Sequence, residues 1–249
     1  MHRFVLTVCT LALAAGCNKD TAPTTTPEPV AAEPAVETEP EPEPEPEPED
    51  QRAAHTRVCD EEGKVEVCTA LAVMYERGRE GPQDLAKARE YYVKGCDGGH
   101  DLGCYNLALM LEKGVGGEAE PDRARELYLQ TCEAKLEGAC FDAAIVVESG
   151  VGGDPDKAKA RELYDLSCQS GEMRGCAQLG RLTVLGEGGK KDLKAARALF
   201  EQSCDGGDMF GCYNLSLALD KGLGGKKDRK LAAEKQKQAC EGGYQPACG

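Results

Sequence analysis

Cysteines recur along most of this 249-residue chain with a period of 36 residues. Two interleaved series keep the period, and only the first pair, Cys59 and Cys68, is spaced one residue wider than the others. The twelve cysteines are Cys59, Cys68, Cys96, Cys104, Cys132, Cys140, Cys168, Cys176, Cys204, Cys212, Cys240 and Cys248. Self-similarity at a period of roughly 20 to 50 residues is typical of solenoids, in which each unit buries its apolar face against its neighbours. We therefore expect residues 51–249 to form one stack of repeats.

Other positions recur in step with the cysteines. One column holds glycines, at Gly78, Gly114, Gly150, Gly186 and Gly222, and a second holds alanines, at Ala88, Ala124, Ala160, Ala196 and Ala232. A third column is small, with Ala72, Ala108, Ala144, Gly180 and Ser216. Small side chains allow helices to approach closely, so these columns predict tightly packed helices.

Each unit predicts two helices. The first contains Leu107 and Leu111 and ends at Gly114, because glycine most easily adopts the left-handed conformation that closes a helix. The second begins after an acidic column, Asp84, Glu120, Asp156, Asp192 and Asp228, in which aspartate is a good helix cap. Its buried stripe combines the alanine column with Tyr92, Tyr128, Tyr164 and Phe200, and we expect each aromatic to project into a neighbouring unit. Lys235 and Gln236 replace this stripe in the last unit, which predicts a solvent-facing C-terminal cap.

The N-terminus is not expected to belong to the fold. A basic start and a short apolar run predict a signal peptide over residues 1–16. Its end, Leu13-Ala14-Ala15-Gly16-Cys17, resembles the bacterial lipoprotein box, which implies lipidation of Cys17 and attachment to a membrane. In the alternative, Cys17 is an ordinary cysteine after a plain secretory signal. Asn18, rather than aspartate, follows Cys17, which by analogy favours the outer membrane of a bacterial cell envelope.

Residues 17–50 predict a disordered acidic tether after the anchor. Nine prolines and eleven acidic residues fall between residues 18 and 50, with almost no large apolar side chains to offset the entropy of ordering. This segment carries about −10 of the chain's net charge of −14, so the repeats themselves are only mildly acidic. An acidic balance excludes nucleic acid as a partner, because phosphate is held by clusters of lysine and arginine.

Two stretches of the chain resemble a known family. The segments CDGGHDLGCYNLALMLEKGVGG, from Cys96 to Gly117, and CDGGDMFGCYNLSLALDKGLGG, from Cys204 to Gly225, are similar to Sel-1-like repeats of the cysteine-rich Hcp type. The resemblance covers roughly residues 51–249. It implies an all-α fold, a right-handed α-solenoid of about five αα-hairpins with a disulfide in every unit. Penicillin binding and weak β-lactamase activity are associated with the same family.

The cysteines admit two disulfide schemes and one metal alternative. Local pairing, as in 59–68 and 96–104, uses all twelve repeat cysteines, whereas pairing Cys104 with Cys132 strands Cys59 and Cys248. Completeness therefore favours the local scheme, and an oxidising compartment explains the even count. Metal or haem binding is disfavoured because only His55 and His100 follow the signal peptide, and no C-x2-C-H motif is present. We expect no metal and no cofactor.

The sequence offers no recognisable catalytic site. The motifs S-x-x-K, K-T-G, G-x-S-x-G, H-x-H and H-E-x-x-H are absent, so no catalytic residue is predicted and His100 is expected in an exposed turn. Stacked hairpins instead offer a groove for peptides, and one polar column suits this role, with Asn106, Asp142, Gln178 and Asn214. We therefore expect a scaffold that binds a protein, a peptide or an envelope component such as a peptidoglycan-related ligand. An Hcp-type β-lactamase with a β-lactam ligand and a purely structural spacer are the alternatives.

Overall fold

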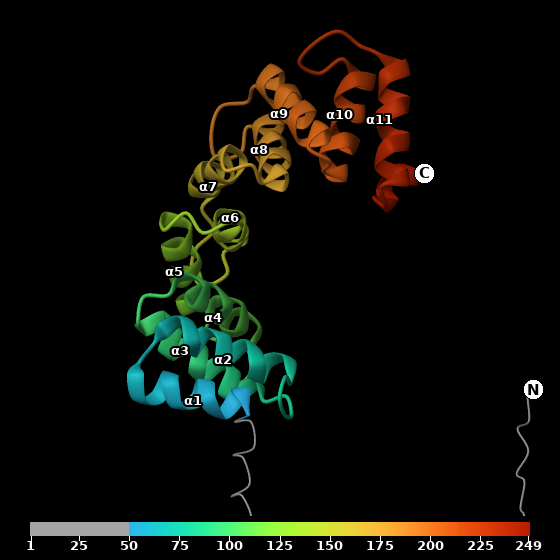
Figure 1. The fold of residues 1–249 in the computed structure, drawn as a ribbon. Helices are drawn as coiled ribbons and strands as arrows, with labels where there is room; N and C mark the ends of the chain where they lie inside the picture. Colours follow the sequence, from blue (N-terminus) through green and yellow to red (C-terminus); the bar gives the residue numbers. More distant parts are fainter. Residues whose placement is uncertain (1–49) are drawn as a thin grey trace, which may run out of the picture. The chain divides into compact units, whose positions relative to one another are not determined.

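The computed structural model describes residues 50–249, and the regular structure of this region is helical throughout (Figure 1). Its helices are α1 (Gln51–Glu62), α2 (Val65–Arg77), α3 (Leu85–Asp97), α4 (Asp101–Lys113), α5 (Pro121–Glu133), α6 (Ala139–Ser149), α7 (Lys157–Gln169), α8 (Met173–Leu185), α9 (Leu193–Asp205), α10 (Met209–Lys221), α11 (Arg229–Glu241) and the short 3-10 helix η1 (Gln245–Cys248). No helix among them is long and apolar enough to cross a membrane. The predicted signal peptide, the lipidation site Cys17 and nearly all of the tether lie outside the described residues.

The helices pair into five hairpins, α2–α3, α4–α5, α6–α7, α8–α9 and α10–α11, and each helix packs against the one before and the one after it. We call the first helix of each hairpin helix A and the second helix B. The hairpins follow one another as a stack in Figure 1. The prediction of an all-α solenoid of helical hairpins is confirmed.

Both predicted helix boundaries are confirmed. The glycine column ends every helix A in the left-handed conformation, with φ from 64° at Gly78 to 79° at Gly150. Four aspartates of the acidic column accept hydrogen bonds from backbone N–H groups in the first turn of helix B. The exception is Glu120, which makes no side-chain cap, and there Pro121 occupies the first turn instead.

The core is built from the small columns and the aromatic column. Alanines of helix B are buried, and the side chains of Tyr92, Tyr128 and Tyr164 are only 1% exposed. The ring contacts of these aromatics lie within one hairpin: Tyr128 contacts Tyr105, and Phe200 lies against Gly180, where a Cβ would clash with the ring. These contacts differ from the expected projection into a neighbouring unit. At Gly180 the small column therefore leaves room for the aromatic ring of its own hairpin.

Five of the six disulfides join the end of one helix to the start of the next helix A, and the sixth joins α11 to η1. The six are Cys59–Cys68, Cys96–Cys104, Cys132–Cys140, Cys168–Cys176, Cys204–Cys212 and Cys240–Cys248, the local scheme. Closing a loop of this length contributes about 2.5 kcal/mol in the chain-entropy model. The wider first pair is closed as well, because α1 occupies the place of a helix B in an incomplete leading unit.

A second link between hairpins was not predicted. Arginine occupies one column of helix B, and each guanidinium donates to a backbone carbonyl in the loop of the next hairpin. Arg89 Nη1 donates to the Glu118 oxygen at 2.6 Å, and Arg197 Nη1 donates to the Lys226 oxygen at 2.9 Å. Arg125 and Arg161 reach the carbonyls of Asp154 and Glu187. Since α1 is a helix B, its buried Arg52 makes the same link, to the Pro82 and Arg79 carbonyls.

The arginine link explains a second glycine column. A Cβ placed on Gly117 would come within 2.7 Å of Arg89 Nη1, and one on Gly225 within 2.8 Å of Arg197 Nη1. Glycine leaves the room that the guanidinium needs to reach the loop backbone. The sequence carried this signal, because arginine and glycine recur 28 residues apart in four units.

The C-terminal end of the stack is partly covered. Ala233 stands where the other helices B carry the linking arginine. The Cys240–Cys248 disulfide holds η1 against α11, and Gln236 Nε2 donates to the Ala247 carbonyl at 3.1 Å. Lys235 and Gln236 are consequently half-buried, so the prediction of a fully solvent-facing cap is wrong in this detail.

We expect the substitution Arg89→Met to destabilise the joint between α3 and the α4–α5 loop. It removes the bonds to the Glu118 carbonyl and the Glu120 carboxylate while it keeps most of the apolar stem. The free energy of unfolding in urea should fall by about 1.5–3 kcal/mol, the usual worth of a hydrogen bond to a charged group. Arg77→Met, on the exposed end of α2, is the matched control. Equal losses in the two variants would contradict the link.

Candidate functional site

The exposed surface of the A helices is the candidate site, and we call it the helix-A face. Three columns form it, spaced as i, i+3 and i+7, so they share one side of each helix. The first is Ala70, Asn106, Asp142, Gln178 and Asn214, the predicted binding column; the second is Val73, Leu109, Ile145, Arg181 and Leu217; the third is Arg77, Lys113, Ser149, Leu185 and Lys221. All fifteen side chains are exposed or half-buried.

The four polar residues of the predicted binding column differ in their hydrogen bonding. Asp142 accepts a hydrogen bond from the Tyr105 hydroxyl at 2.5 Å, and Gln178 Oε1 accepts one from Arg181 Nε at 2.7 Å. Asn214 Nδ2 donates to the Phe210 carbonyl at 2.8 Å, which leaves its own amide oxygen open. Within residues 50–249 the Asn106 amide has no partner. Asn106 and Asn214 therefore keep capacity for a ligand, whereas Asp142 and Gln178 are already engaged.

Apolar side chains accompany this polar column. Ile145 is 39% exposed, Leu217 is 37% exposed and Leu185 is 57% exposed, and large apolar groups this open to water are few in the described chain. Val73 and Leu109 continue the same column in the earlier hairpins and are half-buried. Peptide-binding surfaces usually combine two kinds of group. Polar groups form hydrogen bonds with the peptide backbone, and apolar groups pack against the peptide side chains.

Three cavities lie along the helix-A face. One of about 420 Å³ includes Ala70 and Val73, one of about 500 Å³ includes Ile145 and Gln178, and one of about 220 Å³ includes Asn214 and Leu217. Of the four predicted binding residues, Gln178 and Asn214 line two of these cavities. The surface is hollowed repeatedly along the stack, as a binding face for an extended ligand would be.

Tyrosine–glutamate pairs border this face in the first three hairpins. The hydroxyls of Tyr92, Tyr128 and Tyr164 donate to Glu76, Glu112 and Glu148 at 2.5, 2.8 and 2.9 Å. Each pair joins helix B to helix A of its own hairpin. Burial first, and then the adjacent carboxylate, raise the pKa of each of these phenols above its usual value.

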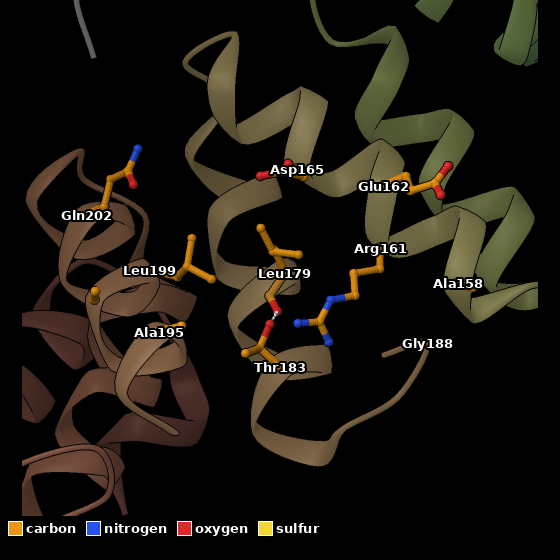
Figure 2. A pocket seen from close by; sticks show the side chains of 11 residues that line it. Ala158, Arg161, Glu162, Asp165, Leu179, Thr183, Gly188, Ala195, Leu199 and Gln202 are labelled. Carbon is orange, nitrogen blue, oxygen red and sulfur yellow. Dashed lines mark hydrogen bonds between the residues drawn. The ribbon is translucent and has the colours of Figure 1, made fainter. Parts of the chain in front are cut away.

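A larger cavity lies on the other side of the fold, between two helices B. It has a volume of about 630 Å³, and its walls come from α7 and α9 with Leu179 and Thr183 of α8 between them (Figure 2). The Arg161 guanidinium extends toward Thr183, yet its bond goes to the Glu187 carbonyl, and the Thr183 hydroxyl donates to the Leu179 carbonyl. The guanidinium is thus engaged by the link to the next hairpin and the Thr183 hydroxyl by a bond within α8, so neither group is free in the cavity.

The described residues give no support to a catalytic site. His100 is half-buried rather than exposed: it is the residue before α4, and its Nδ1 lies 2.7 Å from the Thr69 hydroxyl. His55 Nδ1 lies 2.7 Å from the Gln51 carbonyl. Between residues 50 and 249, no three His, Cys, Asp or Glu side chains gather in a way that could hold a metal ion.

The tyrosine pairs predict a loss of stability at alkaline pH. Because the folded chain raises the pKa of these phenols, it holds their protons after the unfolded chain has released them. Their stabilising contribution is complete below the ordinary tyrosine pKa of about 10 and is lost as the pH rises above it. Urea unfolding should show a smaller alkaline loss for Tyr128→Phe than for the unchanged protein. An identical loss in both proteins would contradict this origin.

Comparisons with known proteins agree with the repeat architecture. The Sel1 repeat family model matches residues 65–100, 102–136, 138–172, 174–208 and 210–244, which are the five hairpins with part of each connecting turn. Cytochrome c oxidase assembly factor 7 of Mus musculus is 40% identical over 53 residues, which are 19% of this chain and 23% of that protein.

Two solved structures show similar folds. A protective antigen present in uropathogenic Escherichia coli strains, with an SLR fold, is 25% identical, has a TM-score of 0.74, and the match covers 80% of this chain and 43% of that one. A Sel1 repeat protein from Oxalobacter formigenes is 22% identical with a TM-score of 0.72, and 79% of each chain is covered. This chain thus spans less than half the length of the mouse and Escherichia coli relatives. Five matched repeats, covering more than half of its residues, show that the chain belongs to the Sel1 repeat family, and it is a scaffold of Sel1 repeats with a disulfide in every repeat.

Proposed function

We propose that the chain is a secreted scaffold, anchored to a membrane by lipid on Cys17, that binds an extended segment of a partner protein or another envelope component. The observation that carries the proposal is the placement of the polar column on the helix-A face, where Gln178 and Asn214 line cavities in successive hairpins. Sel1 repeat proteins generally bind protein partners, which agrees with this use of the surface. The acidic tether of residues 17–50 would separate the repeats from the membrane.

The spacing of the repeats suits an extended ligand. An extended chain advances about 3.3 Å per residue, so a peptide of several residues can pass from one helix A to the next. An asparagine amide offers both a donor and an acceptor and can pair with the N–H and C=O of one peptide group. Within the described chain, both the donor and the acceptor of the Asn106 amide are free, and the amide oxygen of Asn214 is free to accept a hydrogen bond.

The double substitution Asn106→Ala and Asn214→Ala should weaken the retention of a partner. Loss of two hydrogen bonds to a peptide backbone corresponds to about a tenfold weaker affinity. The measurement is affinity capture on the full-length protein from its own cell envelope, with each captured protein quantified by mass spectrometry. Gln130→Ala with Gln202→Ala, two exposed amides of α5 and α9, is the matched control. A partner that both double variants retain equally would rule out the polar column.

The anchor has its own test. The substitution Cys17→Ser should shift the protein from the membrane fraction to the soluble fraction of the envelope and should remove the lipid mass from its N-terminal peptide. Cys9→Ser is the control, because Cys9 lies in the predicted signal peptide and should leave both properties unchanged. A Cys17→Ser protein that stays in the membrane fraction, or a wild-type N-terminal peptide without lipid, would contradict the anchor.

A further inference from the structure

The fourth hairpin departs from the repeat pattern at one place. The tyrosine–glutamate pair of the first three hairpins is replaced on both sides at once, by Phe200 on α9 and Val184 on α8. Neither side chain can take part in the hydrogen bond that the pair makes elsewhere. The site of the missing pair is therefore apolar, whereas the same site in the preceding hairpins is polar.

Two further exchanges point to the same place. Leu185 stands in a column that holds Arg77, Lys113, Ser149 and Lys221 in the other hairpins. Ala218 stands in a column that otherwise holds larger methionine, valine or leucine side chains. These exchanges lie around a pocket of about 220 Å³ whose apolar lining is Val184, Leu185, Phe200, Leu217, Ala218 and Leu223, and whose polar lining is Arg181, Asn214 and Lys221. We call it the repeat-four pocket.

The pocket presents apolar surface that the fold itself does not cover. Leu185 and Leu217, at its edge, are the 57% and 37% exposed leucines of the helix-A face. Contiguous apolar surface open to water marks interaction sites in soluble proteins. A volume of about 220 Å³ is below the roughly 300–1,000 Å³ of small-molecule sites, so it suits one large apolar side chain rather than a whole organic ligand.

Charge separates this end of the repeats from the other. Residues 65–172 contain 12 basic and 21 acidic residues, net −9, whereas residues 173–244 contain 13 basic and nine acidic residues, net +4. The loops between helices A and B carry Glu118 and Asp154 in the second and third hairpins, and paired lysines in the fourth and fifth. Those paired lysines are Lys190, Lys191, Lys226 and Lys227.

Several of these lysines are available for a ligand. Lys221 lines the repeat-four pocket, and the loop that contributes Leu223 continues to Lys226. In the part of the chain that the structure describes, neither lysine has an ion-pair partner, and the same is true of Lys190 and Lys191. Lys221 in the wall of the pocket, with Lys226 further along the loop of Leu223, complements an acidic segment that carries one bulky apolar side chain.

We propose that the repeat-four pocket binds an acidic peptide segment by one large aliphatic or aromatic side chain, with Lys221 and the lysine loops holding the acidic residues on either side. This inference rests on the proposed function and specifies the chemistry of the partner. A recessed pocket favours a single side chain of a peptide over a lipid surface, which exposed, protruding apolar groups would suit better.

The equivalent residues of the first three hairpins indicate which substitutions should close the pocket. The double substitution Val184→Glu and Phe200→Tyr rebuilds the pair that three other hairpins already accommodate, so the fold should tolerate it. The reverse exchange in the second hairpin, Glu112→Val with Tyr128→Phe, is the matched control. For charge, Lys221→Glu is compared with Lys113→Glu, which occupies the same position of the repeat.

The probe is a fluorescein-labelled synthetic peptide with one leucine flanked on both sides by glutamates, titrated with full-length protein and followed by anisotropy. We expect saturable binding that weakens at higher salt, about tenfold or greater loss with Val184→Glu and Phe200→Tyr, and a similar loss with Lys221→Glu. The two control variants, Glu112→Val with Tyr128→Phe and Lys113→Glu, should keep the wild-type affinity. A peptide with alanine in place of leucine, or with lysines in place of glutamates, should bind at least tenfold more weakly.

Several results would overturn the repeat-four pocket as a peptide site. They are no saturable binding of the leucine peptide, equal affinity for the alanine peptide, unchanged affinity after the pocket is closed, or binding to anionic phospholipid vesicles in place of the peptide. The scaffold function can be tested separately from the pocket with the single substitution Asn106→Ala, because Asn106 is not among the residues that line the pocket. If that variant weakens capture of a native partner while Val184→Glu with Phe200→Tyr does not, the scaffold function stands and the pocket inference fails.

Discussion

The link between one hairpin and the next is the constraint on which the fold depends. Each joint uses a disulfide at the C-terminal end of helix B and an arginine from its N-terminal half, which reaches the following loop. The interior combines the small columns with fully buried leucines and tyrosines, among them Leu107, Leu182 and Tyr128. Short-range links of this kind suit a stack in which a hairpin touches only its neighbours, because no distant part of the chain holds it in place.

Much of the architecture could be predicted from the sequence because it repeats. The glycine that ends helix A and the aspartate that begins helix B act within a few residues, so their patterns are readable without a structure. The local cysteine pairing was favoured because it leaves no repeat cysteine unpaired, and it is confirmed. The arginine link was missed because its acceptor is a backbone carbonyl, which no residue type marks. In the sequence, only the glycine column that faces the arginines indicated this link, as at Gly117 beside Arg89.

The candidate site was harder to predict than the fold. The sequence located the polar column, but only the structure separates Asp142 and Gln178, which are engaged by neighbours, from Asn106, which is not. The position of His100 was also misjudged, because its contact with Thr69 joins residues 31 positions apart. In a repeat protein, function is most visible where a unit departs from its siblings, and Val184 with Phe200 is such a departure because both partners of a contact changed together.

Uniform joints have a consequence for how such a chain can change in length. Since the disulfide, the arginine and its facing glycine recur at the same offset, a block of 36 residues cut at equivalent positions carries a complete set of connecting parts. Duplication or deletion of one block would leave every remaining joint intact. The number of hairpins is therefore free to vary between relatives while the first and last units stay the same. The number of side chains that a ligand can contact would vary with it.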